Sequence, residues 1–413
     1  MGILTDSTEQ LLSGTQAADF LGVKSATLYA YASRGLIESI SADKGRERRY
    51  RLSDLIKLRQ SARGFKSVKD ITTPVWTGPV IKSSITEITN TGHYYRGQDA
   101  IKLARQDEPF EMVAELIWET TGKQKSWAKL KPLVLSKQAK SLISTDVDQL
   151  DLLKFLLAAL EMTEPVHRKL VAEDAVDGAR QLMVTMAVAL GISEGRDKYM
   201  ADGKFPIAQT LLFALSGENS LERARAINRA LVLCADHELN ASAFAARVAA
   251  SCDSSLYSCL LSALGTFTGS FHGSASRRAE DTVNSSMTYK TARAWMKDYL
   301  RQFDRIKGFG SELYEAGDPR GRLLIETARS MSSQNKHLQR LFEIVECVRE
   351  QLGKEPNIDV GLAAISYALD LPPGSGSAIF AVSRTSGWIA HAIEQRLYGG
   401  GMIRPRARYI GKG

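Results

Sequence analysis

The chain has 413 residues, of which 44% are hydrophobic, so it is long enough for two or three domains with a sizeable buried core. Its formal net charge of +8 is modest, and its longest apolar runs are about half as long as a membrane span requires, which argues against a membrane protein. The N-terminus lacks the pattern of a secretion signal, and four cysteines without CxxC spacing argue against a disulfide or zinc framework, so we expect a cytoplasmic protein without a bound metal.

The N-terminal segment predicts two short helices, a basic segment and a third helix. Thr15 and Ser25 are suitable N-caps for two helices that end at the glycines following them. The basic segment KGRERRYR comes next, and Ser53 can cap the helix that begins DLIKL. Through LGVKSATLYAYASRGLI and RRYRLSDL, this order resembles the winged helix-turn-helix of the MerR-like DNA-binding family.

The resemblance implies which side chains of this domain, residues 1–64, would meet DNA. Base and phosphate contacts would come from the second helix and the basic wing, through Lys24, Thr27, Tyr31, Arg46, Arg48, Arg49 and Arg51. Such modules also serve as protein-docking domains, so the sequence leaves DNA binding and protein docking open.

The main body of the chain is predicted to be helical. From about residue 84, apolar side chains recur at three- and four-residue spacing, as in PFEMVAELIWETTG and GWIAHAIEQRLYGG. Strand signals are scarce and no solenoid repeat is present. The expected fold class is therefore mainly α, with a winged helix-turn-helix domain at 1–64 and a proline-containing linker at 65–83 before the helical part.

Several stretches interrupt the helical pattern with small residues, histidines and arginines. They are CADHELNAS (234–242), GSFHGSAS (269–276), GFGSELYEAGDPRGR (308–322), PNIDVGLAA (356–364), FAVSRTSGWIAHAIEQ (380–395) and the tail IRPRARYIG (403–411). Each alone has an ordinary explanation as a core histidine, a helix cap or surface charges. Together, in this order and after YYRGQDAIKLARQDEPFEMVAELIW, they resemble the citrate synthase family from about residue 84 to the end.

The family resemblance implies a catalytic set. Joining an acyl-CoA to a 2-keto acid requires a base that removes a proton from carbon and a donor that stabilises the enolate oxygen. The resemblance places the base on Asp359 and the donor on His272. It places keto-acid binding on His237, and the arginines that would bind a dicarboxylate in fork geometry are Arg320, Arg384 and Arg404.

The resemblance also implies partners and domains. The glycine-rich loop Gly308, Phe309 and Gly310 would let the backbone approach the CoA nucleotide closely. Acyl-CoA would be a substrate, with no separate cofactor, and a small dicarboxylate would be the second ligand. Arg404 would come from the neighbouring subunit of a dimer. A large helical domain, 84–274 with 384–413, would be closed by a smaller one, 275–383.

The sequence departs from the family at two places in this set. Ser311 stands where the family has a histidine that donates to the keto carbonyl, and loss of such an acid typically costs about 10²- to 10⁴-fold in rate. Near His272, Ser274 and Ser276 replace glycine and asparagine, and Arg277 stands where an acidic or neutral residue is common.

Three interpretations follow from these departures. The protein is an active enzyme with a slower or altered reaction, in which Glu312 or a water replaces the acid. Alternatively, it is an impaired subunit that pairs with an intact homologue. In the third interpretation it is a sensor, in which an acyl-CoA or carboxylate changes the DNA affinity of the helix-turn-helix domain.

The remaining histidines and cysteines carry less information. His93, His167 and His337 lie in polar stretches, so we expect them at the surface, whereas His391 is expected to be structural although near the pocket. Cys252 and Cys259 are expected to be core thiols.

Overall fold

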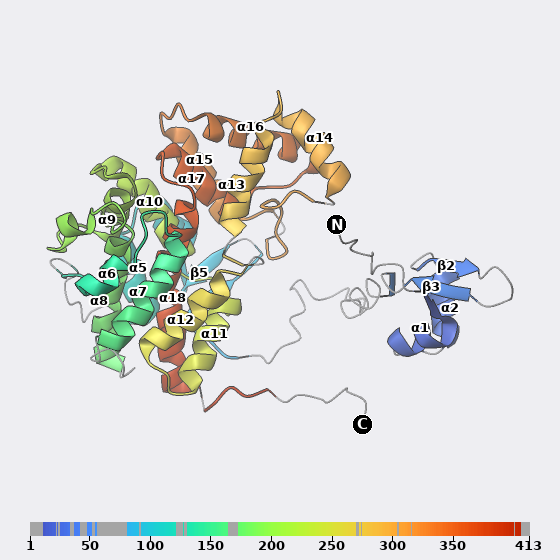
Figure 1. Cartoon of the computed structure of the whole chain (residues 1–413), viewed down its shortest axis with the longest axis horizontal. Coiled ribbons are helices and arrows are strands. Elements are labelled where there is room, and N and C mark those ends of the chain that lie inside the picture. Colours follow the sequence, from blue (N-terminus) through green and yellow to red (C-terminus); the bar gives the residue numbers. More distant parts are fainter. Residues whose placement is uncertain are drawn as a thin grey trace. The chain divides into compact units, whose positions relative to one another are not determined.

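The computed structural model describes residues 11–21, 23, 25–33, 37–41, 48–51, 54–55, 81–90, 92–120, 127, 130–163, 172–269, 272–273, 275–303, 305–314, 316–399 and 401–405 (Figure 1). The chain divides into two compact units, residues 1–79 and 80–413. Most of the predicted linker, 65–83, lies outside the described residues.

The N-terminal unit contains two helices and a three-stranded sheet. Its elements are β1 (Leu11–Ser13), α1 (Gly14–Leu21), α2 (Ser25–Ser33), β2 (Ser39–Ser41) and β3 (Arg48–Arg51). The central strand β3 pairs antiparallel with both β1 and β2, and the fully buried Tyr50 joins Ala17 and Leu28 in the core. The two predicted helices are confirmed, and the basic segment contributes strand β3, which pairs with β2. Thr15 is not the cap of α1: it lies inside the helix, and the Ser13 Oγ accepts from the Gln16 N–H at 3.3 Å instead. β1 was not predicted, and only Asp54 and Leu55 of the third helix are described.

The C-terminal unit begins with a small antiparallel sheet, β4 (Thr86–Ile88), β5 (His93–Tyr95) and β6 (Gln98–Asp99), with β5 in the centre. The rest is helical, as predicted. The helices are α4 (Ala100–Arg105), α5 (Phe110–Trp118), α6 (Lys137–Ser141), α7 (Gln149–Thr163), α8 (Ala172–Ala189), the short 3₁₀ helix η2 (Asp197–Met200), α9 (Ile207–Ser216), α10 (Leu221–Cys234), α11 (Ala241–Ser251), α12 (Leu256–Phe267), α13 (Ala275–Ser286), α14 (Ala292–Gln302), α15 (Pro319–Ser330), α16 (Lys336–Leu352), α17 (Ile358–Ala368) and α18 (Ser375–Tyr398).

Helix α18 is the central scaffold of this unit (Figure 1). It packs against α10, α11, α12 and α8, and nearly all of its side chains up to Gln395 are buried. A helix that is enclosed on all sides can hold polar groups only where partners satisfy them. The buried Arg384 and His391 of α18 therefore mark places where the core is polar.

Helices α15 and α17 cross at very short range. A Cβ atom added to Gly321 of α15 would lie 2.3 Å from the carbonyl oxygen of Asn357, which caps α17. Glycine at this position lets the backbones touch. As a result, the N-terminal ends of the two helices lie side by side, and the Asp318 carboxylate accepts a hydrogen bond from the Ile358 N–H at 3.1 Å.

The predicted division into a large and a small helical domain stays a prediction. Helices α13 to α17 are grouped together in Figure 1, and α13 starts at the predicted boundary. The second boundary, between 383 and 384, falls inside the continuous helix α18.

Two minor expectations can be compared with the fold. Cys259 is buried, but Cys252 is exposed because it is the C-cap residue at which α11 ends. Among the described residues, no helix combines the length and hydropathy that a membrane span needs.

Candidate active site

The segment that follows α10 brings His237 next to Arg384. The Arg384 Nε donates to the carbonyl oxygen of Cys234 at 2.7 Å, three residues before His237. Arg384 is only 2% exposed, and its Nη2 has no hydrogen-bond partner among the described residues. A buried guanidinium with an unused donor is costly unless an acceptor meets it, so this side chain is suited to an anionic ligand.

His237 is half-buried and contacts groups from two other parts of the fold. Its Nε2 lies 2.7 Å from the hydroxyl oxygen of Tyr314, and its ring centroid lies 5.6 Å from that of His93. Burial and the nearby Arg320 guanidinium hold the pKa of His237 well below its ordinary value. The imidazole is therefore neutral and can donate one hydrogen bond without carrying charge.

The position of His93 contradicts the sequence-based expectation of a surface residue. His93 is fully buried, because it alternates with Tyr94 on strand β5 and shares the inward face with Tyr95. Its Nε2 lies 3.1 Å from the Tyr95 hydroxyl, which itself donates to the Val232 carbonyl at 2.9 Å. Period-two alternation with a buried tyrosine was the signal that could have identified it.

The other histidines follow different patterns. His391 is buried, as its structural assignment implies: its Nδ1 accepts from Arg247 Nε at 3.1 Å, and its Nε2 lies 3.3 Å from Asp236. His337 is half-buried and stacks on Tyr367 rather than standing in solvent. His167 lies outside the described residues.

Asp318 fixes Arg320 at the edge of the site. The Arg320 Nε and Nη2 donate to the two carboxylate oxygens of Asp318 at 2.9 and 2.8 Å, a bidentate pair. The same carboxylate caps α15 by accepting from the Arg320 N–H at 3.0 Å. Because both side chains are nearly fully buried, the guanidinium keeps its charge and its orientation.

Asp359 lies in the first turn of α17 and is held by two hydrogen bonds. Its Oδ1 accepts from the Ser276 hydroxyl at 2.9 Å, and its Oδ2 accepts from the Asn357 side-chain amide at 3.2 Å. Burial raises the pKa of Asp359 to about 6, although the Ser276 hydrogen bond and Arg320 act in the opposite direction. The carboxylate is thus ionised near neutral pH and more basic than an ordinary aspartate.

His272 is oriented by Ser242 of α11. Its Nε2 lies 2.8 Å from the Ser242 hydroxyl oxygen, which also accepts from the Trp388 indole N–H at 2.9 Å. Burial, with a contribution from Arg384, lowers the pKa of His272 to about 4, so the ring is neutral. The Ser242 hydroxyl also donates to Asn240 Oδ1 at 2.7 Å; when its proton turns to Nε2 instead, the opposite nitrogen of His272 carries the proton and is available as a donor.

The glycine-rich loop is pinned to the start of α17. Gly308 and Gly310 have φ values of 88° and 82°, a region that favours glycine. The Gly310 N–H donates to the Glu355 carbonyl at 2.8 Å, and the Gly308 carbonyl accepts from the Asn357 N–H at 2.9 Å. Phe309 between them is half-buried. The loop is therefore hydrogen-bonded to Asn357, which precedes Asp359 by two residues in the chain.

Ser311 and Arg404 stand apart from the other predicted site residues. Ser311 is exposed, and its Oγ accepts from the N–H groups of Leu313 and Tyr314 at 3.1 and 3.2 Å, so it closes a turn. The side chain of this loop that reaches His237 is Tyr314, which the sequence did not single out. Arg404 is exposed in the short described tail 401–405.

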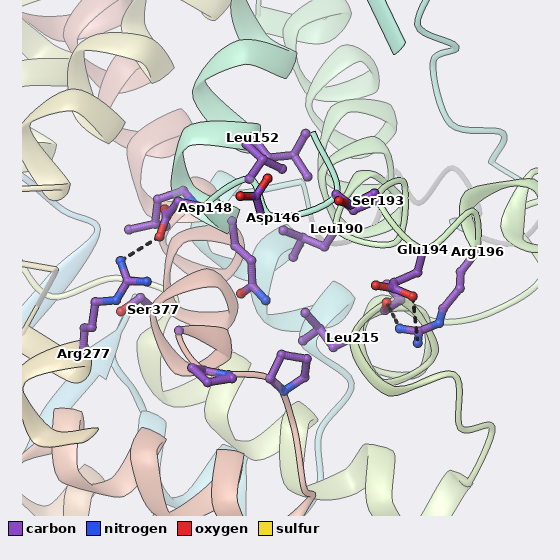
Figure 2. Close-up of a pocket in the computed structure, with 18 residues that line it drawn as sticks. Asp146, Asp148, Leu152, Leu190, Ser193, Glu194, Arg196, Leu215, Arg277 and Ser377 are labelled. Carbon is purple, nitrogen blue, oxygen red and sulfur yellow. Dashed lines mark hydrogen bonds and ion pairs between the residues drawn. The ribbon is translucent and has the colours of Figure 1, made fainter. Parts of the chain in front are cut away.

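The departures next to His272 have separate consequences. Ser276 binds Asp359, whereas Arg277 points to a different place, where its Nη1 lies 2.7 Å from the Asp148 carboxylate. Figure 2 shows this pair at a cleft of about 390 Å³. The cleft is lined by residues 145–150, by the ends of α8 and α9, and by the connection between α17 and α18. None of the predicted catalytic or substrate-binding residues lines this cleft. Ser274 lies outside the described residues.

The predicted DNA-binding residues are only partly described. Arg48 and Arg49 are exposed on β3, and Arg51 lies 3.9 Å from Glu38. Thr27 and Tyr31 on α2 are half-buried, and Tyr31 packs on the core of the N-terminal unit. Lys24 and Arg46 lie outside the described residues.

In the part of the chain that the structure describes, no group of three or more acidic, histidine and cysteine side chains has metal-binding geometry.

Comparison with known proteins identifies the family. Residues 75–406 match the family described as citrate synthase, C-terminal domain, and residues 11–63 match a helix-turn-helix domain. The citrate synthase of Haloferax volcanii is 33% identical over 344 residues, which cover 77% of this chain and 89% of that protein. Citrate synthase 2 of Bacillus subtilis is 29% identical over 347 residues, which cover 80% of this chain and 93% of that protein. The chain belongs to the citrate synthase family and carries an N-terminal helix-turn-helix domain.

The fold comparison agrees. A solved citrate synthase from Thermoplasma acidophilum, in a ternary complex with carboxymethyl coenzyme A and oxaloacetate, superposes with a TM-score of 0.70 at 23% identity. The match covers 82% of this chain and 95% of that one. At this identity, the likeness concerns the fold.

Proposed function

We propose that the protein is a cytoplasmic acyltransferase that condenses an acyl-CoA with a 2-keto dicarboxylic acid such as oxaloacetate. The observation that carries the proposal is the environment of Asp359, a buried carboxylate with a pKa of about 6 that Ser276 and Asn357 hold in place. Asp359 has no ion-pair partner among the described residues. A buried carboxylate of this kind is costly to maintain, and proton removal from carbon is a task that requires one.

The proposed reaction assigns each residue one task. Asp359 removes a proton from the carbon next to the thioester, and the neutral His272 donates a hydrogen bond to the enolate oxygen. The enolate carbon then attacks the keto carbon of the second substrate, which His237 helps to hold. Water finally cleaves the thioester, and free CoA thiol leaves.

The arginines give the dicarboxylate specificity of the proposal. Arg384 offers a buried donor that no described residue accepts from, and Arg320 is held by Asp318 with a defined orientation. We assign the third carboxylate contact to Arg404 of a second copy of the chain, because its own subunit leaves it exposed on the tail. The proposal therefore includes a dimer with shared sites, acyl-CoA as substrate and no cofactor.

A thiol-release assay tests the proposal. The purified full chain is mixed with acetyl-CoA or propionyl-CoA and a 2-keto dicarboxylate, and free thiol is followed with time. We expect release that depends on the keto acid and that falls at least about 10³-fold in the Asp359→Asn variant, because the base is lost. Asp298→Asn, at a half-exposed aspartate on α14 outside the proposed site, is the matched control. If the chain alone releases no thiol but does so after an intact homologue is added, the impaired-subunit alternative would be favoured instead.

The helix-turn-helix unit supports a second candidate function, DNA binding that responds to the ligand of the condensing domain. The supporting observation is the pair of exposed arginines, Arg48 and Arg49, on the predicted wing. Fluorescence anisotropy with a palindromic duplex should show salt-dependent affinity that the R48A/R49A variant loses. A DNA affinity that changes neither with salt concentration nor with these substitutions would contradict DNA binding through the wing.

A further inference from the structure

We infer that Tyr314 supplies the hydrogen-bond donor, and then the proton, that the family takes from a histidine at the position of Ser311. This inference rests on the proposed function, because it assigns a residue to the keto-acid half of that reaction. Attack on the keto carbon turns its carbonyl oxygen into an alkoxide, which needs a donor at that point.

Ser311 does not fill this role in the observed loop. Its side chain is exposed and directed at its own turn, where its hydroxyl oxygen accepts from the N–H groups of Leu313 and Tyr314, whereas the side chain of this loop that reaches His237 is that of Tyr314. Glu312, the other candidate on the loop, is also exposed. The turn that Ser311 closes instead directs the next aromatic side chain inward.

Tyr314 has the position that the role requires. It is 2% exposed, and its hydroxyl oxygen lies 2.7 Å from Nε2 of His237, the predicted keto-acid ligand. An oxygen atom placed beside this pair can accept from both groups after a small rotation of either side chain. Imidazole and phenol would then act on the same atom, as two donors do in an oxyanion hole.

The electrostatics around Tyr314 suit proton transfer. The phenol is neutral throughout the physiological range, since burial raises its pKa to about 12. In the step, the Tyr314 O–H bond breaks, the proton forms a new O–H bond on the alkoxide oxygen, and a phenolate remains until water reprotonates it. The guanidinium carbon of Arg320, 5.7 Å from the ring centroid, stabilises that phenolate.

Steady-state thiol release with four variants tests the inference. Y314F is expected to lose about 100-fold in kcat with less than a threefold change in the KM of the keto acid, because the missing interaction forms only in the transition state. S311H restores a donor to the loop, so it should raise kcat at least about tenfold in the Y314F background but less than threefold in the unmodified chain. Y367F is the matched control: it removes a buried hydroxyl on α17 that has no described hydrogen-bond partner, and should leave kcat within twofold.

The possible failures are distinguishable. If the unmodified chain releases thiol and Y314F keeps its kcat within threefold, the role of Tyr314 is refuted and the proposed function stands. If no acyl-CoA and keto-acid pair gives thiol release with the unmodified chain, both are refuted. Should Y314F not fold, as judged by circular dichroism, a rise of tenfold or more in the single S311H variant would still overturn the inference, and a rise below threefold would support it.

Discussion

Asp359 shows how one residue combines a function with a cost in stability. Its pKa in the fold, about 6, lies above the 3.8 of an ordinary aspartate, so the stability that the protonated carboxyl group contributes is fully present below about pH 4 and is lost as pH rises through 6. At pH 7.5 the buried charge costs up to about 3 kcal/mol relative to a neutral carboxyl group.

The variant D359N removes this charge while keeping the shape of the side chain. We therefore expect D359N to unfold at the same or a higher temperature than the unmodified chain at pH 7.5, although it is inactive, and the difference to shrink at pH 4.5. Thermal denaturation at both pH values measures this. A lower melting temperature of D359N at pH 7.5 would show that the ionised carboxylate stabilises the fold.

The same carboxylate predicts a pH profile. Because the base must be ionised, kcat/KM should rise about tenfold per pH unit below pH 6 and level off above it. In S276A the hydrogen bond that favours the ionised form is absent, so the midpoint should move to higher pH. S262A, at an exposed position of α12, should leave the midpoint unchanged. A midpoint of S276A at or below that of the unmodified chain would contradict the assigned hydrogen bond.

At the scale of elements, the crossing of α15 and α17 positions Arg320 relative to Asp359. In G321A the new methyl group would lie 2.3 Å from the Asn357 carbonyl, so the helices must separate. We expect the free energy of unfolding to fall by about 1–3 kcal/mol. The rate of thiol release should also fall, because Arg320 and Asp359 no longer keep their relative positions.

The control for this variant is G265A on α12, where an added Cβ meets no described atom within 4 Å. Alanine at a helix position without a clash is neutral or stabilising by up to about 1 kcal/mol. Urea denaturation compares the two variants. If G321A is as stable and as active as G265A, the close crossing is not what positions the site.

The helices of this chain could be predicted because their apolar spacing is regular, and the site motifs because small and polar residues interrupt that spacing. Asp359, His272 and His237 lie in these motifs, and the family resemblance supplied their predicted roles. The direction of a loop side chain could not. Whether Ser311 or Tyr314 faces His237 depends on the left-handed conformations of Gly308 and Gly310 and on the pairing of this loop with residues 355–357, which no local pattern reveals.

The burial of His93 and the exposure of Cys252 also could not be predicted from the sequence. His93 lies in a polar stretch, but a short strand turns it into the core. Cys252 follows a largely apolar stretch, but α11 ends there. Both outcomes depend on where an element begins or ends, and element ends are set by tertiary contacts as much as by sequence.

At the scale of the whole molecule, the assignment of Arg404 to a neighbouring subunit predicts complementation. In a mixed dimer of D359N and R404A, one site combines both defects and the other is intact. Mixing the two inactive variants after dissociation should therefore restore about a quarter of the normal activity, because half of random dimers are mixed and each has one intact site. Absence of recovery, with mixed dimers verified by differently tagged chains, would place Arg404 outside the shared site.

The central claim is that Asp359 removes a proton from the carbon of an acyl-CoA. Exchange of the acetyl-CoA methyl protons for deuterium in D₂O, followed by NMR with a bound keto-acid analogue, observes this step without the later ones. The account predicts exchange with the unmodified chain and a loss of at least about 100-fold in D359N. No exchange in the unmodified chain, or exchange that persists in D359N, would contradict it.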